Sequence, residues 1–454
     1  MQKLFDEVGS LDRRCYEEFE LSEDILMEHA ADGMADFIRA KFPHGTKVVV
    51  ACGSGNNGAD GIALARLLHK DYEVEIFYVK KPSSQMALLQ QKRVESVNIP
   101  TCQELRSCDV VVDAIVGTGF SGEFDERLSK IIEQMNNLSA YKIACDVPSG
   151  YKFHADTTLT MGALKRDMFL DKHKDFVGEI KVLDLGISRG IYEGDTSWHL
   201  LDFEDIKLPF RDKKDTHKGS FGHLALACGD KSGASVISSL SALRFGSGLV
   251  TLVGFESISI PHAIMYSHEL PCNTTALACG MGLGDGFSDT ELERFLDNDL
   301  PLICDADIFH MPIILKILKR KNIVLTPHPR EFIALLKQTN LADITVEELQ
   351  NKRFFYVELF CTKFPHATLL LKGANVIVAC GNEFFINPHG TQTLAKGGSG
   401  DVLSGLVGAL LAQGYTPLEA AKTASLTHTK LACGYKGADF SLTADDLIMG
   451  ISKL

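Results

Sequence analysis

A glycine-dense loop with a single carboxylate, residues 397–401, stands directly before an apolar stretch near the end of the chain. Apolar residues with helical spacing predict a buried helix that begins at about Ser399: Leu403, Leu406, Val407, Leu410 and Leu411. Unpaired amides at a helix start attract phosphate or a developing oxyanion. Asp401 either caps this helix or takes a proton from a hydroxyl that attacks phosphorus.

A second glycine-rich loop, residues 53–58, follows an apolar run and fits the Gly-x-Gly-x-x-Gly pattern of nicotinamide dehydrogenases. A dehydrogenase would need an acidic residue at the end of the next strand, where this chain has Lys80 and Lys81. The loop also carries Asn56 and Asn57, more polar side chains than a backbone cradle for phosphate requires. A plain turn remains the alternative to a binding site.

Two further loops place polar side chains after neighbouring strands. Asp113 and Asp146 each end a β-branched run, and Ser149 follows the second of them. With Asn57 they should meet in one crevice at the carboxyl ends of the strands. Oxygen ligands without His or Cys suit a hard cation, including a monovalent one, and Asp146 is alternatively a base.

The elements that must position these residues alternate along the chain as short strands and helices. At 454 residues, two domains are expected. The alternation predicts an α/β protein in which each domain is a mostly parallel sheet flanked by helices, Rossmann-like in the first half. A polar, charged stretch puts the boundary near 210, giving domains 1–210 and 211–454. A first helix is predicted over 25–38, and strands over 47–51, 73–79, 109–116, 142–146, 223–227, 249–253, 275–279, 302–305, 322–325 and 368–371.

Composition excludes several classes of protein. A formal net charge of −13 without a basic run argues against a nucleic-acid surface. The 12 cysteines are scattered without zinc spacing, which indicates reduced core residues. The longest uncharged run, which begins at Val402, is too short and too rich in glycine for a membrane span, and the start of the chain is polar. We expect a cytoplasmic protein that does not bind membranes.

The loops of the first half resemble those of NAD(P)H-hydrate epimerases, the first module of the bifunctional NAD(P)H-hydrate repair enzymes. The resemblance runs from residues 53–61 through 113–122 and 146–150 to 185–187. It implies that Asp146 is the acid/base and that Asn57, Asp113 and Ser149 bind potassium. It also implies substrate contacts by Asn56, Asn57, Gly58, Ala59, Asp60, Gly117, Thr118, Gly119, Phe120, Ser121, Gly122, Glu123 and Asp146.

The second half resembles the dehydratase module of the same family, which is ribokinase-like. The similar stretches are residues 218–223, 325–331, 371–374 and 397–401. By this resemblance Asp401 is catalytic and contacts the hydrate together with Ala234, Gly282, Gly284 and His328, and the nucleotide is bound by Lys372, Gly373, Ala374, Asn375, Val376, Ser399 and Gly400. His328 between two prolines is otherwise a loop histidine with a satisfied hydrogen bond, and the roles of Asp305 and Asp307 stay open. Ala59, Met281 and Arg330 depart from the family pattern.

The resemblance implies repair of hydrated NADH and NADPH (NADHX and NADPHX). The first domain would interconvert the R and S hydrates. The second would use ADP or ATP with magnesium to phosphorylate the C6 hydroxyl of the S hydrate, after which phosphate elimination restores the coenzyme. We expect a homo-oligomer. The alternative is a ribokinase-like vitamin or pyrimidine kinase with a non-catalytic nucleotide-binding first domain.

Overall fold

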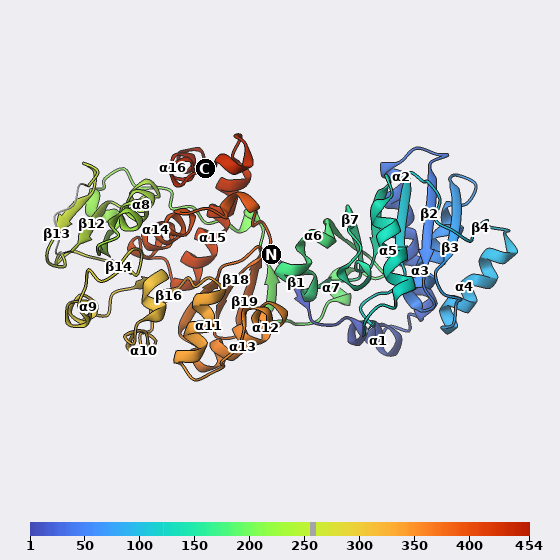
Figure 1. Ribbon diagram of the computed structural model, residues 1–454, viewed down its shortest axis with the longest axis horizontal. Coiled ribbons are helices and arrows are strands. Elements are labelled where there is room, and N and C mark those ends of the chain that lie inside the picture. The colour runs from blue at the N-terminus through green and yellow to red at the C-terminus, as the bar shows by residue number, and fades with distance from the viewer. Residues whose placement is uncertain (121, 255–259) are drawn as a thin grey trace. The chain divides into compact units, whose positions relative to one another are not determined.

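The computed structural model describes residues 1–120, 122–254 and 260–454, and the chain forms two compact units (Figure 1). The first unit is Lys3–Thr196, and the second is Met1–Gln2 with Ser197–Leu454. The division therefore lies earlier than the predicted position 210. The reason is that β10 (Trp198–Leu200) pairs in parallel with β19 (Glu383–Asn387) and so belongs to the second unit.

The first unit contains a seven-stranded parallel sheet in the order β4-β3-β2-β5-β6-β7-β9. Its strands are β2 (Lys47–Cys52), β3 (Glu73–Tyr78), β4 (Thr101–Cys102), β5 (Val110–Ala114), β6 (Tyr141–Cys145), β7 (Thr157–Met161) and β9 (Glu179–Leu183), and a short β1 (Gln2–Phe5) pairs with β8 (Leu164–Lys165). The central strands are rich in valine because helices bury both faces of the sheet.

Helices cover the two faces unequally. The core on one face includes α2 (Glu23–Lys41), α3 (Asn56–Leu68) and α4 (Gln85–Ser96), and the core on the other includes α5 (Glu126–Asn137). The shorter helices are α1 (Gly9–Glu18), α6 (Lys174–Val177) and α7 (Arg189–Tyr192). The strand order reverses between β2 and β5, and ligands in such sheets bind beyond the carboxyl ends of the strands at that point.

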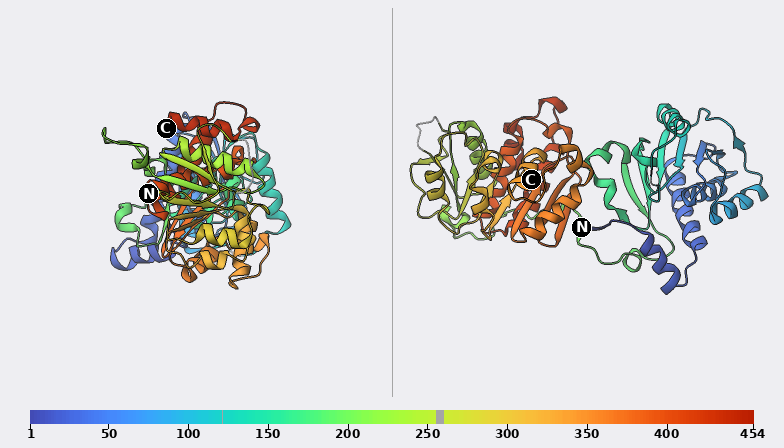
Figure 2. Two further views of the ribbon diagram at one scale, coloured as in Figure 1. Left: turned by 90° about the vertical axis from the view of Figure 1, so that its left-hand side faces the viewer. Right: turned by 60° about the horizontal axis from the view of Figure 1, so that its bottom comes forward.

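The sheet of the second unit runs in the order β13-β12-β11-β14-β15-β16-β17-β18-β19-β10 and is parallel from β13 to β17, with β18 antiparallel to both its neighbours. The remaining strands are β11 (His223–Ala227), β12 (Leu249–Val253), β13 (Met265–Ser267), β14 (Ala276–Cys279), β15 (Leu302–Cys304), β16 (Ile323–Leu325), β17 (Ala367–Leu371) and β18 (Val376–Cys380). The helices are α8 (Ser232–Arg244), α9 (Asp289–Leu296), α10 (Ile314–Ile317), α11 (Pro329–Gln338), α12 (Val346–Asn351), α13 (Arg353–Lys363), α14 (Ser399–Ala412), α15 (Pro417–Cys433) and α16 (Ala444–Gly450), and Figure 2 shows them flanking the sheet.

The helix after the glycine-dense loop, α14, begins at Ser399 as predicted and is buried along almost its whole length. It packs against α8 closely enough that a β-carbon on Gly405 would lie 2.2 Å from the Ser238 carbonyl oxygen. The Ser238 and Ser241 hydroxyls donate 2.9 Å hydrogen bonds to the carbonyls of Asp401 and Val402. This contact with α8 fixes the first turn of α14.

The predicted α/β class is confirmed, and each predicted strand is present with shifts of one or two residues at its ends. The helix predicted over 25–38 is present as α2, but it is not the first helix, because α1 precedes it. Among the residues of α1 only Leu11 and Cys15 are buried, so its apolar pattern is too sparse to recognise. Within the described part of the chain, no helix combines the length and the apolar character needed to cross a membrane.

Replacing Gly405 with alanine should destabilise the second unit by about 1–3 kcal/mol, because the added methyl group overpacks the contact with α8. Thermal unfolding measures the effect. Gly233→Ala on α8 is the matched control, since a β-carbon there meets nothing within 4 Å. Equal unfolding temperatures for the two variants would contradict the close packing.

Candidate active sites

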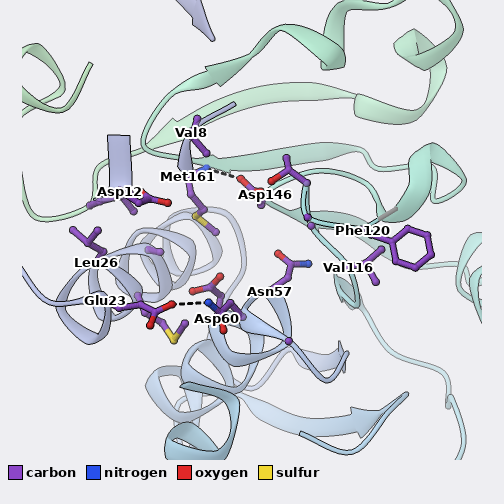
Figure 3. Close-up of a pocket in the computed structure, with 18 of the residues that line it drawn as sticks. Val8, Asp12, Glu23, Leu26, Asn57, Asp60, Val116, Phe120, Asp146 and Met161 are labelled. Atoms are coloured by element: carbon purple, nitrogen blue, oxygen red, sulfur yellow. Dashed lines mark hydrogen bonds between the residues drawn. The ribbon is translucent and has the colours of Figure 1, made fainter. Parts of the chain in front are cut away.

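A pocket of about 460 Å³ opens in the first unit where the strand order reverses (Figure 3). Its walls come from the loops after β2, β5 and β6, from the ends of β7 and from helices α1, α2 and α3. A crevice is present at the predicted edge of the sheet, and Asn57 and Asp146 line it, whereas Asp113 and Ser149 do not. The predicted residues that line it are Asn56, Asn57, Asp60, Gly117, Thr118, Gly119, Phe120 and Asp146.

Asp146 has one carboxyl oxygen held and one directed toward the Gly117 loop. Its Oδ1 accepts hydrogen bonds from Lys165 Nζ at 2.5 Å and from the Met161 amide at 3.2 Å. A β-carbon on Gly117 would lie 3.5 Å from Asp146 Oδ2 and from Asn57 Oδ1. The backbone of Asp146 adopts φ +69, a strained conformation for a residue other than glycine. The structure thus fixes the carboxyl orientation at the edge of the pocket.

Lys165 is a residue of this site that the sequence analysis missed. Its side chain is 2% exposed, and Nζ also donates to Thr160 Oγ1 at 2.8 Å and to the Met161 carbonyl at 3.1 Å. A lysine buried this completely needs a carboxylate partner, which Asp146 supplies. The only sequence signal is a lone lysine after the apolar run 161–164.

Asp113 and Ser149 form a fully buried pair behind the pocket. Asp113 Oδ1 accepts from the Ser149 hydroxyl at 2.6 Å, and Oδ2 accepts from the Ser149 amide at 2.8 Å. Burial raises the pKa of Asp113 to about 6, against these hydrogen bonds. The Ser149 hydroxyl also lies 3.2 Å from the Val116 carbonyl, and the buried Asn57 amide nitrogen has no partner among the described residues.

The other predicted contacts of the first unit lie elsewhere. Gly58 and Ala59 are buried inside α3, where the Ala59 methyl group packs with Met27 and Met86. Gly122 lines a neighbouring pocket and Glu123 is exposed, whereas Ser121 lies outside the described residues. Missed residues that line the main pocket are Asp12, Tyr16, Glu23, Met161 and Tyr192.

In the second unit, Asp401 lies in the first turn of α14. Burial raises the pKa of Asp401 to about 6; the negative charge of Asp305 adds to the rise and Lys372 opposes it. The Ser399 amide donates to the Lys396 carbonyl at 3.3 Å, and no partner is given among the described residues for the Gly400 and Asp401 amides that follow it in the first turn of α14. These two amides at the helix start are available to an anion.

Lys372 and Asp305 form an ion pair beside this helix start. Lys372 Nζ donates to Asp305 Oδ1 at 2.7 Å, and Ser404 Oγ donates to Asp305 Oδ2 at 2.7 Å. A β-carbon on Gly400 would lie 3.7 Å from Lys372 Nζ and 3.9 Å from Asp305 Oδ2. Strand β15, strand β17 and helix α14 thus bring one cation and two carboxylates together, and Asp305 gains a role that the sequence left open.

His328 caps helix α11 instead of standing free in a loop. Its Nδ1 accepts hydrogen bonds from the amides of Arg330 and Glu331 at 3.1 and 3.2 Å, which leaves the half-exposed Nε2 for other contacts. Nε2 lies 3.2 Å from Glu331 Oε1, and Glu331 Oε2 lies 3.9 Å from Lys372 Nζ. Glu331, which the sequence analysis missed, links His328 to the Lys372 pair. Burial raises the pKa of Glu331, and the Lys372 charge opposes the rise.

The remaining predicted residues of the second unit form two groups, one proposed to contact the hydrate and one proposed to contact the nucleotide. A β-carbon on Gly282 would lie 3.1 Å from the Ala234 Cβ, and the Gly284 amide donates to Asp307 Oδ2 at 2.9 Å. The nucleotide set continues from Lys372 into β18 through Gly373, Ala374, Asn375 and Val376. Ser399 Oγ lies 3.2 Å from Nε2 of the buried His428, whose pKa burial lowers to about 4, so this histidine is neutral at pH 7.

Sequence comparison matches both units. Residues 224–451 match the family described as NAD(P)H-hydrate dehydratase, and residues 23–169 match the family described as YjeF-related protein N-terminus. The bifunctional NAD(P)H-hydrate repair enzyme Nnr of Helicobacter pylori is 39% identical, with 100% of both chains covered. The enzyme of the same name from Coxiella burnetii is 31% identical, with 94% of both chains covered.

One solved structure that resembles the chain is the ADP/ATP-dependent NAD(P)H-hydrate dehydratase from Bacillus subtilis, co-crystallised with ATP and Mg²⁺. It is 26% identical, has a TM-score of 0.46, and covers 54% of this chain and 92% of its own. The full-length sequence matches decide the assignment. The chain belongs to the family of bifunctional NAD(P)H-hydrate repair enzymes, the family that its loops resemble.

Proposed function

We propose that this chain repairs hydrated NADH and NADPH, with the first unit interconverting the R and S hydrates and the second dehydrating the S hydrate with ADP or ATP. Family membership supports both activities. The observation that carries this proposal is that each unit pairs a carboxylate with a lysine, both largely shielded from solvent, beyond the carboxyl ends of its strands. A vitamin kinase is disfavoured, because the full-length relatives match the first unit as well as the second.

In the first unit, Asp146 acts as acid/base at C6 of the hydrated nicotinamide. Three donors hold Oδ1, from Thr160, Met161 and Lys165, so Oδ2 is the oxygen left to exchange a proton with the substrate. Asn56, Asn57, Asp60 and residues 117–120 line the space that the ring would occupy. Burial and the charges of Asp146 and Asp12 raise the pKa of Asp60, which favours its protonated, hydrogen-bond-donating form.

Asn57, Asp113 and Ser149 would hold potassium in this unit. One carboxylate with neutral hydroxyl, amide and carbonyl oxygens is a donor set suited to a monovalent cation. One observation supports the fit: the single Ser149 hydroxyl proton faces two oxygens, Asp113 Oδ1 and the Val116 carbonyl. The ion would hold the loops after β2, β5 and β6 together behind the pocket.

In the second unit, Asp401 removes the proton of the C6 hydroxyl as its oxygen attacks the terminal phosphorus of the nucleotide. The amides of Gly400 and Asp401, at the positive end of α14, stabilise the negative charge that develops on the phosphoryl oxygens. Loss of phosphate from C6 and of a proton from C5 then restores the ring double bond. We also propose that the hydrate is contacted by Ala234, Gly282, Gly284 and His328. The nucleotide would be contacted by residues 372–376.

Magnesium would enter the second unit together with the nucleotide, and it would neutralise phosphate charge. We also propose a homo-oligomeric assembly and a cytoplasmic location, as expected from the sequence.

Two substitutions in the full-length chain should separate the activities. Asp146→Asn should lower the R-to-S conversion rate by about 10²–10⁴-fold, and Asp401→Asn should lower dehydration of the S hydrate by a similar factor, because each removes a proton-transfer group. Chromatography of the R and S hydrates measures the first activity and the absorbance of the reduced nicotinamide measures the second. Each variant controls for the folding of the other. A variant that loses both activities, or neither, would contradict the assignment.

Asp305→Asn should move the acid limb of the dehydration rate to lower pH. Asp401 works as a base only when ionised, so in the parent enzyme the rate falls as the pH drops through about 6. Removing the Asp305 charge, which raises the Asp401 pKa, should let Asp401 stay ionised at lower pH. The profile of kcat/KM against pH measures this. Asp307→Asn, which removes a carboxylate bonded to Gly284, should leave the limb in place. An acid limb of Asp305→Asn that moves to higher pH, or that does not move, would contradict this prediction.

A further inference from the structure

The N-terminal helix α1 brings a second carboxyl group into the pocket of the first unit. Asp12 lines that pocket, and in Figure 3 its side chain and that of Asp146 lie on either side of Met161. The two groups interact electrostatically, since the negative charge of Asp146 raises the pKa of Asp12. Asp12 lies before residues 23–169, the part that matches the first family.

Asp12 is held in place by a hydrogen bond from the other end of the unit. The Tyr192 hydroxyl, on α7, donates to Asp12 Oδ1 at 2.7 Å. No partner is recorded for Asp12 Oδ2 among the described residues, so one oxygen is fixed and the other is left for a ligand. Asp146 shows the same division between its two oxygens.

Contacts with α1 and with Gly162 hold Tyr192 in place. Arg14 Nη2 donates to the Ile191 and Tyr192 carbonyls at 2.6 and 2.5 Å, which ties α1 to α7. The Tyr192 ring packs on Gly162, where a β-carbon would lie 2.5 Å from the ring. Gly162 directly follows Met161, whose amide donates to Asp146. The two carboxyl groups are therefore positioned by one continuous wall of the pocket.

Inversion at C6 needs proton transfer on both faces of the ring. The hydroxyl leaves as water when an acid protonates it and the ring nitrogen lone pair forms a C6=N1 bond. A solvent water then adds from the opposite face, its oxygen forms the new C6–O bond, the π electrons return to nitrogen, and a base takes the proton. A single carboxyl group reaches one face, so a second group on the other face completes the reaction.

We propose that Asp12 is the second acid/base of the epimerase and works across the ring from Asp146, with Tyr192 as its positioning residue. This rests on the proposed epimerase function. One carboxyl group donates the proton and the other receives it, so each turnover leaves the pair ready for the reverse direction. Burial raises the pKa of Asp12 against the Tyr192 hydrogen bond and the Lys165 charge, which is consistent with a group that exchanges a proton.

The test uses the full-length chain with purified R or S NADPH hydrate and potassium. ADP and ATP are left out, so that dehydration cannot proceed. Asp12→Asn should lower kcat about 10²-fold or more in both directions while KM changes by less than about threefold. Tyr192→Phe should lower kcat about tenfold, the value of one hydrogen bond to a charged group. The double variant should be no slower than Asp12→Asn, because Tyr192 acts through Asp12.

Glu17→Gln is the matched control, since it removes a carboxylate from an exposed position on the same helix. It should keep the parent rate, and thermal unfolding should show that the first unit of every variant is folded. A parent-like kcat for Asp12→Asn, a rise in KM alone, or additive losses in the double variant would overturn the inference. If the parent chain itself does not interconvert the hydrates, the proposed epimerase function fails instead.

Discussion

Both units depend on the same electrostatic constraint: a carboxylate and a lysine that are largely shielded from solvent must be paired with each other, and in each pair one partner is almost fully buried. An unpaired charge in such a place is very costly, whereas a paired one with further hydrogen bonds is tolerated. Lys165 meets this need for Asp146 at 2.5 Å, and Lys372 meets it for Asp305 at 2.7 Å. Each lysine also fixes the direction of the carboxyl group that it contacts.

The two lysine–carboxylate pairs differ in whether the lysine contacts the proposed acid/base itself or its neighbour. This difference fits the two proposed reactions. In the first unit the lysine contacts the proposed acid/base directly and leaves one oxygen of Asp146 for the substrate. In the second unit the lysine contacts the neighbour, so burial and the Asp305 charge together raise the pKa of Asp401 to about 6. A base with a pKa slightly below neutral is ionised at pH 7 and still a good proton acceptor.

Local signals in the sequence predicted the parts of the sites that local structure determines. The start of α14 at Ser399 followed from a glycine-rich loop and a helical apolar pattern, and the convergence of Asn57 and Asp146 followed from parallel strand ends. Lys165 and Asp12 were missed because their partners are set by tertiary packing. No periodicity in the sequence marks a lysine that pairs with an aspartate 19 residues earlier, or a helix that is held at the pocket by a tyrosine about 180 residues later in the chain.

The most direct measurement is the pair of activities in two lysine variants of the full-length chain, Lys165→Met and Lys372→Met, each checked for folding by thermal unfolding. If each paired lysine serves the carboxylates of its own unit, Lys165→Met should lose interconversion of the hydrates and keep dehydration of the S hydrate. Lys372→Met should show the reverse. Parent-like rates in both folded variants, or loss of the same activity in both, would contradict the account.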